Sequence, residues 1–224
     1  MTILATDDWS AQGDNADIGA AWDANTSDPA FFNILSGAAV APDPGFDSSE
    51  SNNAASWPND QYAEAKLNAT HADGVGIGHG VLLRANTSGT RSYYRLVGNA
   101  SGYEFAKMIS GSFTSLASGS GTTFAGADKI YASMVGQQPT LKKNGVSFGS
   151  PPTDSAHSAG KACVAFSSAA AIPSDGITSW EGGDFVPPIP TQRSRSAFRP
   201  ELDEDEGRFN ELDVRNWWRE GLMA

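Results

Sequence analysis

Polar and apolar side chains alternate between Gln61 and Ile109, and this stretch holds the residues best suited to bind a ligand. Because successive side chains of a strand point to opposite faces, the alternation predicts one buried face and one solvated face. The solvated face would collect Tyr62, Glu64, Lys66, Arg84, Arg91, Tyr93 and Arg95. The candidate carbohydrate-binding residues on it are Tyr62, Arg84, Arg91, Tyr93 and Arg95. The alternative is an ordinary solvated sheet face with cross-strand pairs.

Other residue types that carry chemistry are scattered. The three histidines lack the close spacing of a zinc site, and the single cysteine, Cys163, lies in an apolar run that predicts a small buried side chain. The segment 14–17 offers calcium-type oxygens without the closing glutamate of an EF-hand loop. The chain contains neither a Gly-x-Ser-x-Gly elbow nor a phosphate-binding loop. We therefore expect no catalytic residue, no metal and no cofactor, and a structural calcium at 14–17, with help from Asp7 or Asp8, is the open alternative.

Strands are the elements that must position these residues. Segments of 7 or 8 residues with turn formers between them predict an antiparallel meander over 61–67, 77–84, 91–97 and 103–109. Further strands are expected at 3–9, 129–135, 161–166 and 176–185, and hairpin turns at Ser36-Gly37 and Asn144-Gly145. The total is about twelve or thirteen strands, with no helix before Val186. The segment 42–53 is expected to be a loop.

Composition limits the partners. The 224 residues carry a net charge of −11 and a pI near 4.6, which argues against nucleic acid because phosphate binding requires a cationic surface. The N-terminus shows neither a positively charged signal-peptide region nor an apolar run long enough for a membrane span, so we expect synthesis in a cytoplasm and no membrane partner. Four Asn-x-Ser/Thr sequons are interpreted as turn residues: Asn25, Asn68, Asn86 and Asn99.

A series of short motifs follows the chain in a recognisable order. Asp7-Asp8-Trp9 opens it, a Gly-x-x-Trp follows at 19–22, and Pro-Asn-Asp-Gln-Tyr-Ala-Glu leads a strand at 58–64. A Gly-Val-Leu-Leu-Arg strand, a paired-tyrosine strand and a closing Trp-Glu-Gly-Gly-Asp-Phe at 180–185 come later. Together they resemble the concanavalin A-like lectin and glucanase jelly roll of the laminin G-like kind, which is common in bacterial and phage proteins.

The resemblance covers about residues 3–185 and implies an antiparallel sandwich of two curved sheets, whose concave face holds a saccharide in some relatives. It does not imply an activity, because this fold hosts lectins, hydrolases and spacers alike. Glucanases of the superfamily carry Glu-x-Asp-x-x-Glu on one strand, and Glu201, Asp203 and Glu206 match those letters. This match lies after a proline-rich segment and outside the sheet, so we expect it to be coincidental and the protein not to be an enzyme.

The composition changes after Phe185. The run Val186-Pro-Pro-Ile-Pro must be extended, because proline fixes φ. We therefore expect a jelly-roll domain at 1–185, a proline-rich and charged linker at 186–207, and an anchoring segment with a short helix at 208–224. Buried aromatic residues dominate protein interfaces, and the candidate partner anchors are Phe209, Leu212, Trp217 and Trp218. The alternative is that this tail covers its own sandwich.

These features lead to one expected function and its alternatives. The first is a non-enzymatic bacteriophage virion protein, a capsid decoration or other displayed module, held to a capsid or neighbouring virion subunit by its C-terminal arm. It would be made in the host cytoplasm and lie on the virion surface. The second is a carbohydrate-binding module of a receptor-binding or adhesion protein, with a surface glycan as its partner. A glucanase-like hydrolase is the third. Homo-oligomerisation stays open.

Overall fold

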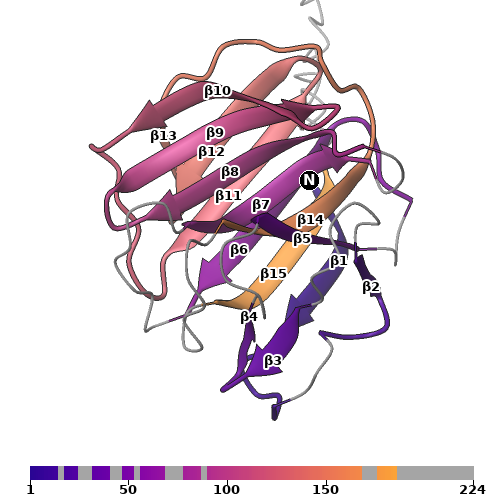
Figure 1. Ribbon diagram of the computed structural model, residues 1–224, viewed down its shortest axis with the longest axis vertical. Coiled ribbons are helices and arrows are strands. Elements are labelled where there is room, and N and C mark those ends of the chain that lie inside the picture. Colours follow the sequence, from indigo (N-terminus) through magenta and orange to yellow (C-terminus); the bar gives the residue numbers. More distant parts are fainter. Residues whose placement is uncertain are drawn as a thin grey trace, which may run out of the picture. The chain divides into compact units, whose positions relative to one another are not determined.

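Two antiparallel β-sheets make up the part of the chain that the structure, a computed structural model, describes (Figure 1). The described residues are 1–14, 18–24, 32–40, 47–52, 56–68, 78–86, 90–167 and 176–185. They contain fifteen strands and no helix, which confirms the predicted all-β class. Over these same residues, nothing qualifies as a helix that could cross a membrane. The predicted C-terminal arm and its helix lie outside the described residues.

Sheet A contains eight strands, and the last strand of the chain lies near its centre. Its order is β13 (Val146–Phe148), β12 (Gln138–Lys143), β11 (Lys129–Val135), β6 (Gln61–Leu67), β15 (Ile177–Asp184), β4 (Ala38–Val40) and β3 (Asn33–Leu35). Strand β1 (Thr2–Asp8) also pairs with β15. Strand β15 therefore joins β1, β4 and β6, which come from three separate parts of the sequence.

Sheet B contains seven strands and lies in front of sheet A in Figure 1. Its order is β10 (Ser112–Gly119), β9 (Gly102–Ile109), β8 (Tyr93–Asn99), β7 (Gly78–Ala85), β14 (Lys161–Ser167), β5 (Asp47–Asn52) and β2 (Trp22–Ala24). The consecutive strands β7, β8 and β9 are the last three strands of the predicted meander, and β10 extends it by one strand. Strand β5 lies within the segment 42–53 that was expected to be a loop. It escaped prediction because Asp47–Asn52 shows no alternation of polar and apolar residues.

The first strand of the predicted meander belongs to the other sheet. Strand β6 pairs with β11 and β15 in sheet A, whereas β7 pairs with β8 and β14 in sheet B. Alternation correctly identifies which side chains of β6 face the core, since Ala63, Ala65 and Leu67 are all buried there. It carries no information about which sheet a strand joins, and the expectation of one continuous meander from Gln61 is wrong.

The main core fills the space between the sheets. The inward side chains of sheet A pack against those of sheet B, and four tryptophans gather in this core: Trp9, Trp22, Trp57 and Trp180. Their ring centroids lie 4.9 to 5.9 Å apart. A second buried apolar cluster lies on the outward face of sheet B and consists of Leu82, Ala85, Tyr93, Val97, Met108, Cys163 and Ala165. The predicted burial of Cys163 is confirmed.

Both predicted hairpin turns are present. Ser36-Gly37 joins β3 to β4 and Asn144-Gly145 joins β12 to β13, and all four residues have positive φ as a type I′ turn requires. The sequon residue Asn99 is also used in a turn, since its side-chain Oδ1 accepts a hydrogen bond from Ser101 N. These local signals were readable because the turn and its chemistry lie within a few residues.

Asn144 does more than form a turn, and replacing it with aspartate should destabilise the fold. Its Oδ1 accepts a hydrogen bond from Lys129 N at 2.8 Å, and its Nδ2 donates one to Asp128 Oδ1 at 2.6 Å. Asn144→Asp would set a second carboxylate against Asp128. We expect a loss of about 1 to 3 kcal/mol at neutral pH, measured by urea denaturation. Ser147→Asp, which adds the same charge at an exposed position, should change little. An unchanged midpoint for Asn144→Asp would contradict this account.

Candidate functional site

The five predicted carbohydrate-binding residues do not share a face. Tyr62 lies on the outward face of sheet A, whereas Tyr93 and Arg95 lie on the outward face of sheet B. Arg84 is at the end of β7, and Arg91 precedes β8. The prediction of one solvated face is wrong because β6 and β8 belong to different sheets. A direct role for any of the five in ligand binding stays a prediction.

Tyr62 is fully buried, although it points away from the core. Its ring stacks on that of Tyr131 from the neighbouring strand β11, with centroids 5.6 Å apart. Burial, followed by the nearby Glu181 carboxylate, raises the pKa of the Tyr62 phenol above its ordinary value. The phenol is therefore part of the packing of sheet A.

Arg84 holds three loops together. It is 3% exposed, and its guanidinium donates hydrogen bonds to three backbone carbonyls: Asn59 O at 2.9 Å, His157 O at 2.8 Å and Gly136 O at 2.7 Å. Its own backbone N donates to Gln61 Oε1 at 3.0 Å, and its φ is +52°. The charge that sequence reasoning placed in solvent is instead a structural tie between loops from both sheets.

A cleft of about 640 Å³ adjoins Arg84, lined among others by Asp60, Asp184 and His157. Behind it, Asp154 accepts hydrogen bonds from Tyr94 Oη at 2.7 Å and Lys107 Nζ at 2.5 Å. Burial acts to raise the pKa of Asp154, but these hydrogen bonds outweigh it and hold the pKa below its ordinary value. Burial also raises the pKa of Tyr94 to about 12 and lowers that of His157. The network rigidifies this end of the sandwich.

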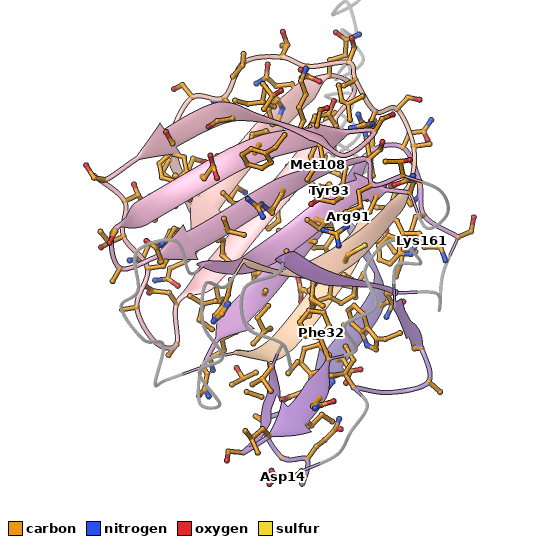
Figure 2. All side chains as sticks on the ribbon, in the orientation of Figure 1. Asp14, Phe32, Arg91, Tyr93, Met108 and Lys161 are labelled. Atoms are coloured by element: carbon orange, nitrogen blue, oxygen red, sulfur yellow. The ribbon has the colours of Figure 1, made fainter. Side chains whose placement is uncertain are left out.

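Tyr93 belongs to the apolar cluster on the outward face of sheet B. It is 2% exposed and pairs across the ladder with Met108, and Figure 2 shows the two side by side with Arg91 near them. Sequence reasoning expected polar surroundings here, because it treated every side chain on the outward face as solvated. The neighbouring positions on β7 and β14 are Leu82, Cys163 and Ala165, so the middle of this face is packed.

Arg95 is buried on the same face and contacts two residues that are more accessible. Its Nη2 lies 3.6 Å from Glu104 Oε2 on β9, and its Cζ lies 4.9 Å from the ring centroid of Phe113 on β10. The Glu104 side chain is 34% exposed and Phe113 is 43% exposed. A buried guanidinium thus orients a carboxylate on one side and an aromatic ring on the other.

Glu104 lines a hollow at the end of sheet B, where β8 turns into β9. The hollow has a volume of about 380 Å³, and its lining residues are Gly78, Val97, Asn99, Ser101, Gly102, Tyr103, Glu104, Ser118, Gly119 and Ser120. Small residues create the space, because glycine and serine project little or no side chain into it. The polar groups there are one carboxylate, one amide and several hydroxyls. Among the lining residues, none is a lysine, arginine or histidine.

The hollow was missed from sequence, and so was a pair of carboxylates. Glu64 and Glu181 are cross-strand partners on the outward face of sheet A. Lys129 Nζ contacts Glu64 at 2.5 Å, and this hydrogen bond raises the pKa of Lys129. We interpret Glu64, Glu181 and Lys129 as part of a surface ion-pair network.

No group of three or more acidic, histidine or cysteine side chains suited to a metal is found among the described residues. The glucanase-like Glu201, Asp203 and Glu206 lie outside those residues, as do the predicted anchors Phe209, Leu212, Trp217 and Trp218.

Comparison with known proteins identifies the fold. No family model matches the sequence, and no curated protein matches it either. Among solved structures, the carbohydrate recognition domain of Emp46p in its metal-free form is similar at 11% identity, with a TM-score of 0.54 over 82% of this chain and 96% of that one. The carbohydrate-binding module CBM66 from Bacillus subtilis is similar at 12% identity, with a TM-score of 0.51 over 73% and 92%. A Bacillus licheniformis β-glucanase is similar at 9% identity, with a TM-score of 0.50 over 78% and 92%.

At these identities the similarity shows the fold alone, and that fold is the concanavalin A-like jelly roll of lectins and glucanases. The resemblance inferred from the sequence is therefore confirmed at the level of the fold. Because the similar structures include both binding proteins and an enzyme, the expectation that this chain is not an enzyme stays a prediction.

Proposed function

We propose that this protein binds a saccharide, and that the hollow beside Glu104 is the binding site. The observation that carries the proposal is the Glu104 carboxylate, held by Arg95 and directed into a space lined by Asn99 and serines. Sugar hydroxyls donate and accept hydrogen bonds in closely spaced pairs. A carboxylate accepts two such donors, and an amide offers one donor and one acceptor. Hydrogen bonds to a charged acceptor are the stronger ones, so Glu104 would supply much of the affinity.

The fold neighbours support the same class of function. A carbohydrate-binding module and a carbohydrate recognition domain share this sandwich, and both are binding proteins by name. The acidic balance of the chain suits a neutral or amine-bearing ligand over an acidic one. The virion role expected from the sequence rests on the family resemblance, on composition and on the anchor-like tail, which lies outside the described residues, and it stays a prediction. So does the location on a virion surface.

Removing the charge of Glu104 tests this proposal. Glu104→Gln should weaken binding about 10- to 100-fold, because a charge-assisted hydrogen bond contributes about 1.5 to 3 kcal/mol. Binding is measured by a glycan array and then by calorimetry with the saccharides that the array identifies. Glu181→Gln, the same change on the outward face of sheet A, is the matched control and should bind like the unmodified protein. A blank array, or equal affinities for Glu104→Gln and the control, would sink the proposal.

A further inference from the structure

We propose that the protein forms a dimer in which strand β10 of one copy pairs antiparallel with strand β10 of a second copy. The pairing joins the two B sheets edge to edge, around a two-fold axis that passes beside Thr114. This inference goes beyond the proposed function and does not depend on it. It rests on the composition of the sheet edges, on the backbone groups that β10 directs outward, and on the side chains that would meet.

Among the edge strands that the structure describes, β10 is the one least protected against pairing. It lies at the end of sheet B, and its eight residues include neither a charged residue nor a proline (Figure 1). Shortness, charge, proline and bulges are what usually keep edge strands from pairing. Strands β2, β3 and β13 have three residues each, and β1 ends in Asp7 and Asp8. A bulge interrupts β10 only after Ser115, so the exposed half Ser112–Ser115 is regular.

The turn before β10 fixes which of its backbone groups point outward. Ser110-Gly111 joins Ile109 to Ser112, and its φ values of +49° and +82° are those of a two-residue type I′ hairpin. Such a turn makes Ile109 and Ser112 a hydrogen-bonded pair, and these pairs alternate with non-hydrogen-bonded ones along an antiparallel ladder. The N–H and C=O groups of Phe113 and Ser115 therefore point away from β9. Over the described residues, no backbone hydrogen bond outside the ladder involves either residue.

One register uses all of these outward groups. When Thr114 faces Thr114 of the second copy, Phe113 lies opposite the second copy's Ser115, and Ser115 opposite its Phe113. Each of these two pairs exchanges two hydrogen bonds, so the contact gains four. A shift toward the turn would instead set Gly111 opposite Ser115, but the Gly111 N already donates to Arg91 O at 3.0 Å. The backbone therefore selects the register with Thr114 at the axis.

The side chains fit this register. Phe113 is 43% exposed, and its ring would pack beside the small Ser115 of the second copy. Two threonines meet at the axis, and threonine pairs are favourable across strands. An antiparallel contact around a two-fold axis is self-complementary, so it is made twice by the same residues. A second copy of this chain is thus the partner that the strand suits.

The absence of charge on β10 matters because the chain is acidic. With a net charge of −11, two copies repel each other and can approach closely only where a surface carries little charge. The two cations beside the strand are each paired, Arg95 with Glu104 and Lys107 with Asp154. The two-fold axis stands perpendicular to the joined sheet, so the two Glu104 carboxylates would lie on the same side of the dimer.

Cysteine cross-linking of the full chain tests the register. Thr114→Cys places two thiols at the axis in a non-hydrogen-bonded pair, whose Cα atoms lie about 4.5 Å apart, within the range of a disulfide. We expect mild oxidation to convert most of this variant to a covalent dimer, since the chain's own Cys163 is buried. Ser112→Cys is the control, because its two copies would lie roughly 13 Å apart along the strands and should not cross-link. Equal cross-linking of the two variants would overturn the proposed pairing.

Sedimentation velocity tests the dimer itself. The mass of the unmodified chain should rise with concentration from that of one copy toward twice that value. Thr114→Glu sets two carboxylates against each other at the axis and should weaken association about tenfold or more. Ser147→Glu is the matched control and should associate like the unmodified chain. Like Thr114, Ser147 is exposed on an edge strand and lies opposite a lysine, Lys142.

Thermal unfolding checks that both glutamate variants fold. A chain that stays monomeric at every concentration up to near-millimolar would overturn the dimer. Equal loss of association in Thr114→Glu and Ser147→Glu would overturn its placement at β10. Neither experiment measures saccharide binding, so a failure here leaves the proposed function standing, and a blank glycan array leaves the dimer standing.

Discussion

Replacing Arg84 with alanine is expected to destabilise the protein by about 3 to 5 kcal/mol, more than any substitution at the proposed binding site. The change removes three hydrogen bonds from a buried guanidinium and leaves the carbonyls of Asn59, Gly136 and His157 without their donor. These carbonyls belong to three different loops, so the loss would loosen the end of both sheets. Urea denaturation at neutral pH, with a check for two-state behaviour, measures the effect. Arg91→Ala is the control, because Arg91 precedes its strand and is partly exposed.

Replacing Arg84 with glycine separates the contribution of its side chain to stability from the cost of its backbone conformation. Arg84 adopts a φ of +52°, a conformation that costs an L-residue roughly 1 kcal/mol or more but is free for glycine. Arg84→Gly should therefore be more stable than Arg84→Ala, although both lack the guanidinium. If the two variants unfold at the same denaturant concentration, the strain assigned to this backbone is wrong. If Arg84→Ala matches the unmodified protein, the hydrogen bonds to the loops carry no net stability.

Gly80→Ala is the second substitution with a large expected effect. A Cβ atom at this position would lie 1.9 Å from the carbonyl oxygen of Leu96 and 2.9 Å from its carbon. Both atoms are backbone atoms of β8, which pairs with β7 at this point, so they cannot move without disrupting the centre of sheet B. We expect a loss of about 3 kcal/mol or more, or failure to fold.

Thermal unfolding and the yield of soluble protein measure the effect of Gly80→Ala. The control is Gly121→Ala, where a Cβ atom would meet no other heavy atom within 4 Å. The stability of this control should stay within about 0.5 kcal/mol of the unmodified protein. A Gly80→Ala protein that melts at the same temperature as the control would show that the close approach of β7 and β8 does not constrain the sequence.

The sequence predicted local structure well because its signals are local. The turns at Ser36-Gly37 and Asn144-Gly145, the order of β7 to β9 and the inward residues of β6 all follow from neighbouring positions. Which sheet a strand joins depends on partners far away in sequence. The partner of β6 is β15, more than a hundred residues later, and no pattern within Gln61–Leu67 records it.

The candidate site was harder to predict for a different reason. The hollow exists because three of its lining residues, Gly78, Gly102 and Gly119, have no side chain to fill it. The run of Ser and Gly at 118–121 is the one local signal for it, because small side chains leave space beside a sheet. Arg84 and Arg95 were assigned to solvent because charged residues are rarely buried without partners. Their partners are loop carbonyls, a carboxylate and an aromatic ring, and all of them come from other segments.

The place of β15 at the centre of sheet A has a consequence for how the chain folds as it is made. Asp8 pairs with Ser179, so β1 leaves the ribosome long before its partner exists. At a synthesis rate of about 5 to 20 residues per second, the delay is roughly 10 to 30 s. During that time β1, β4 and β6 all lack the strand that joins them, and loop closure must still bring them together. Sheet A is thus completed only after Ile177–Asp184 has been synthesised, and until then its earlier strands lack their common partner.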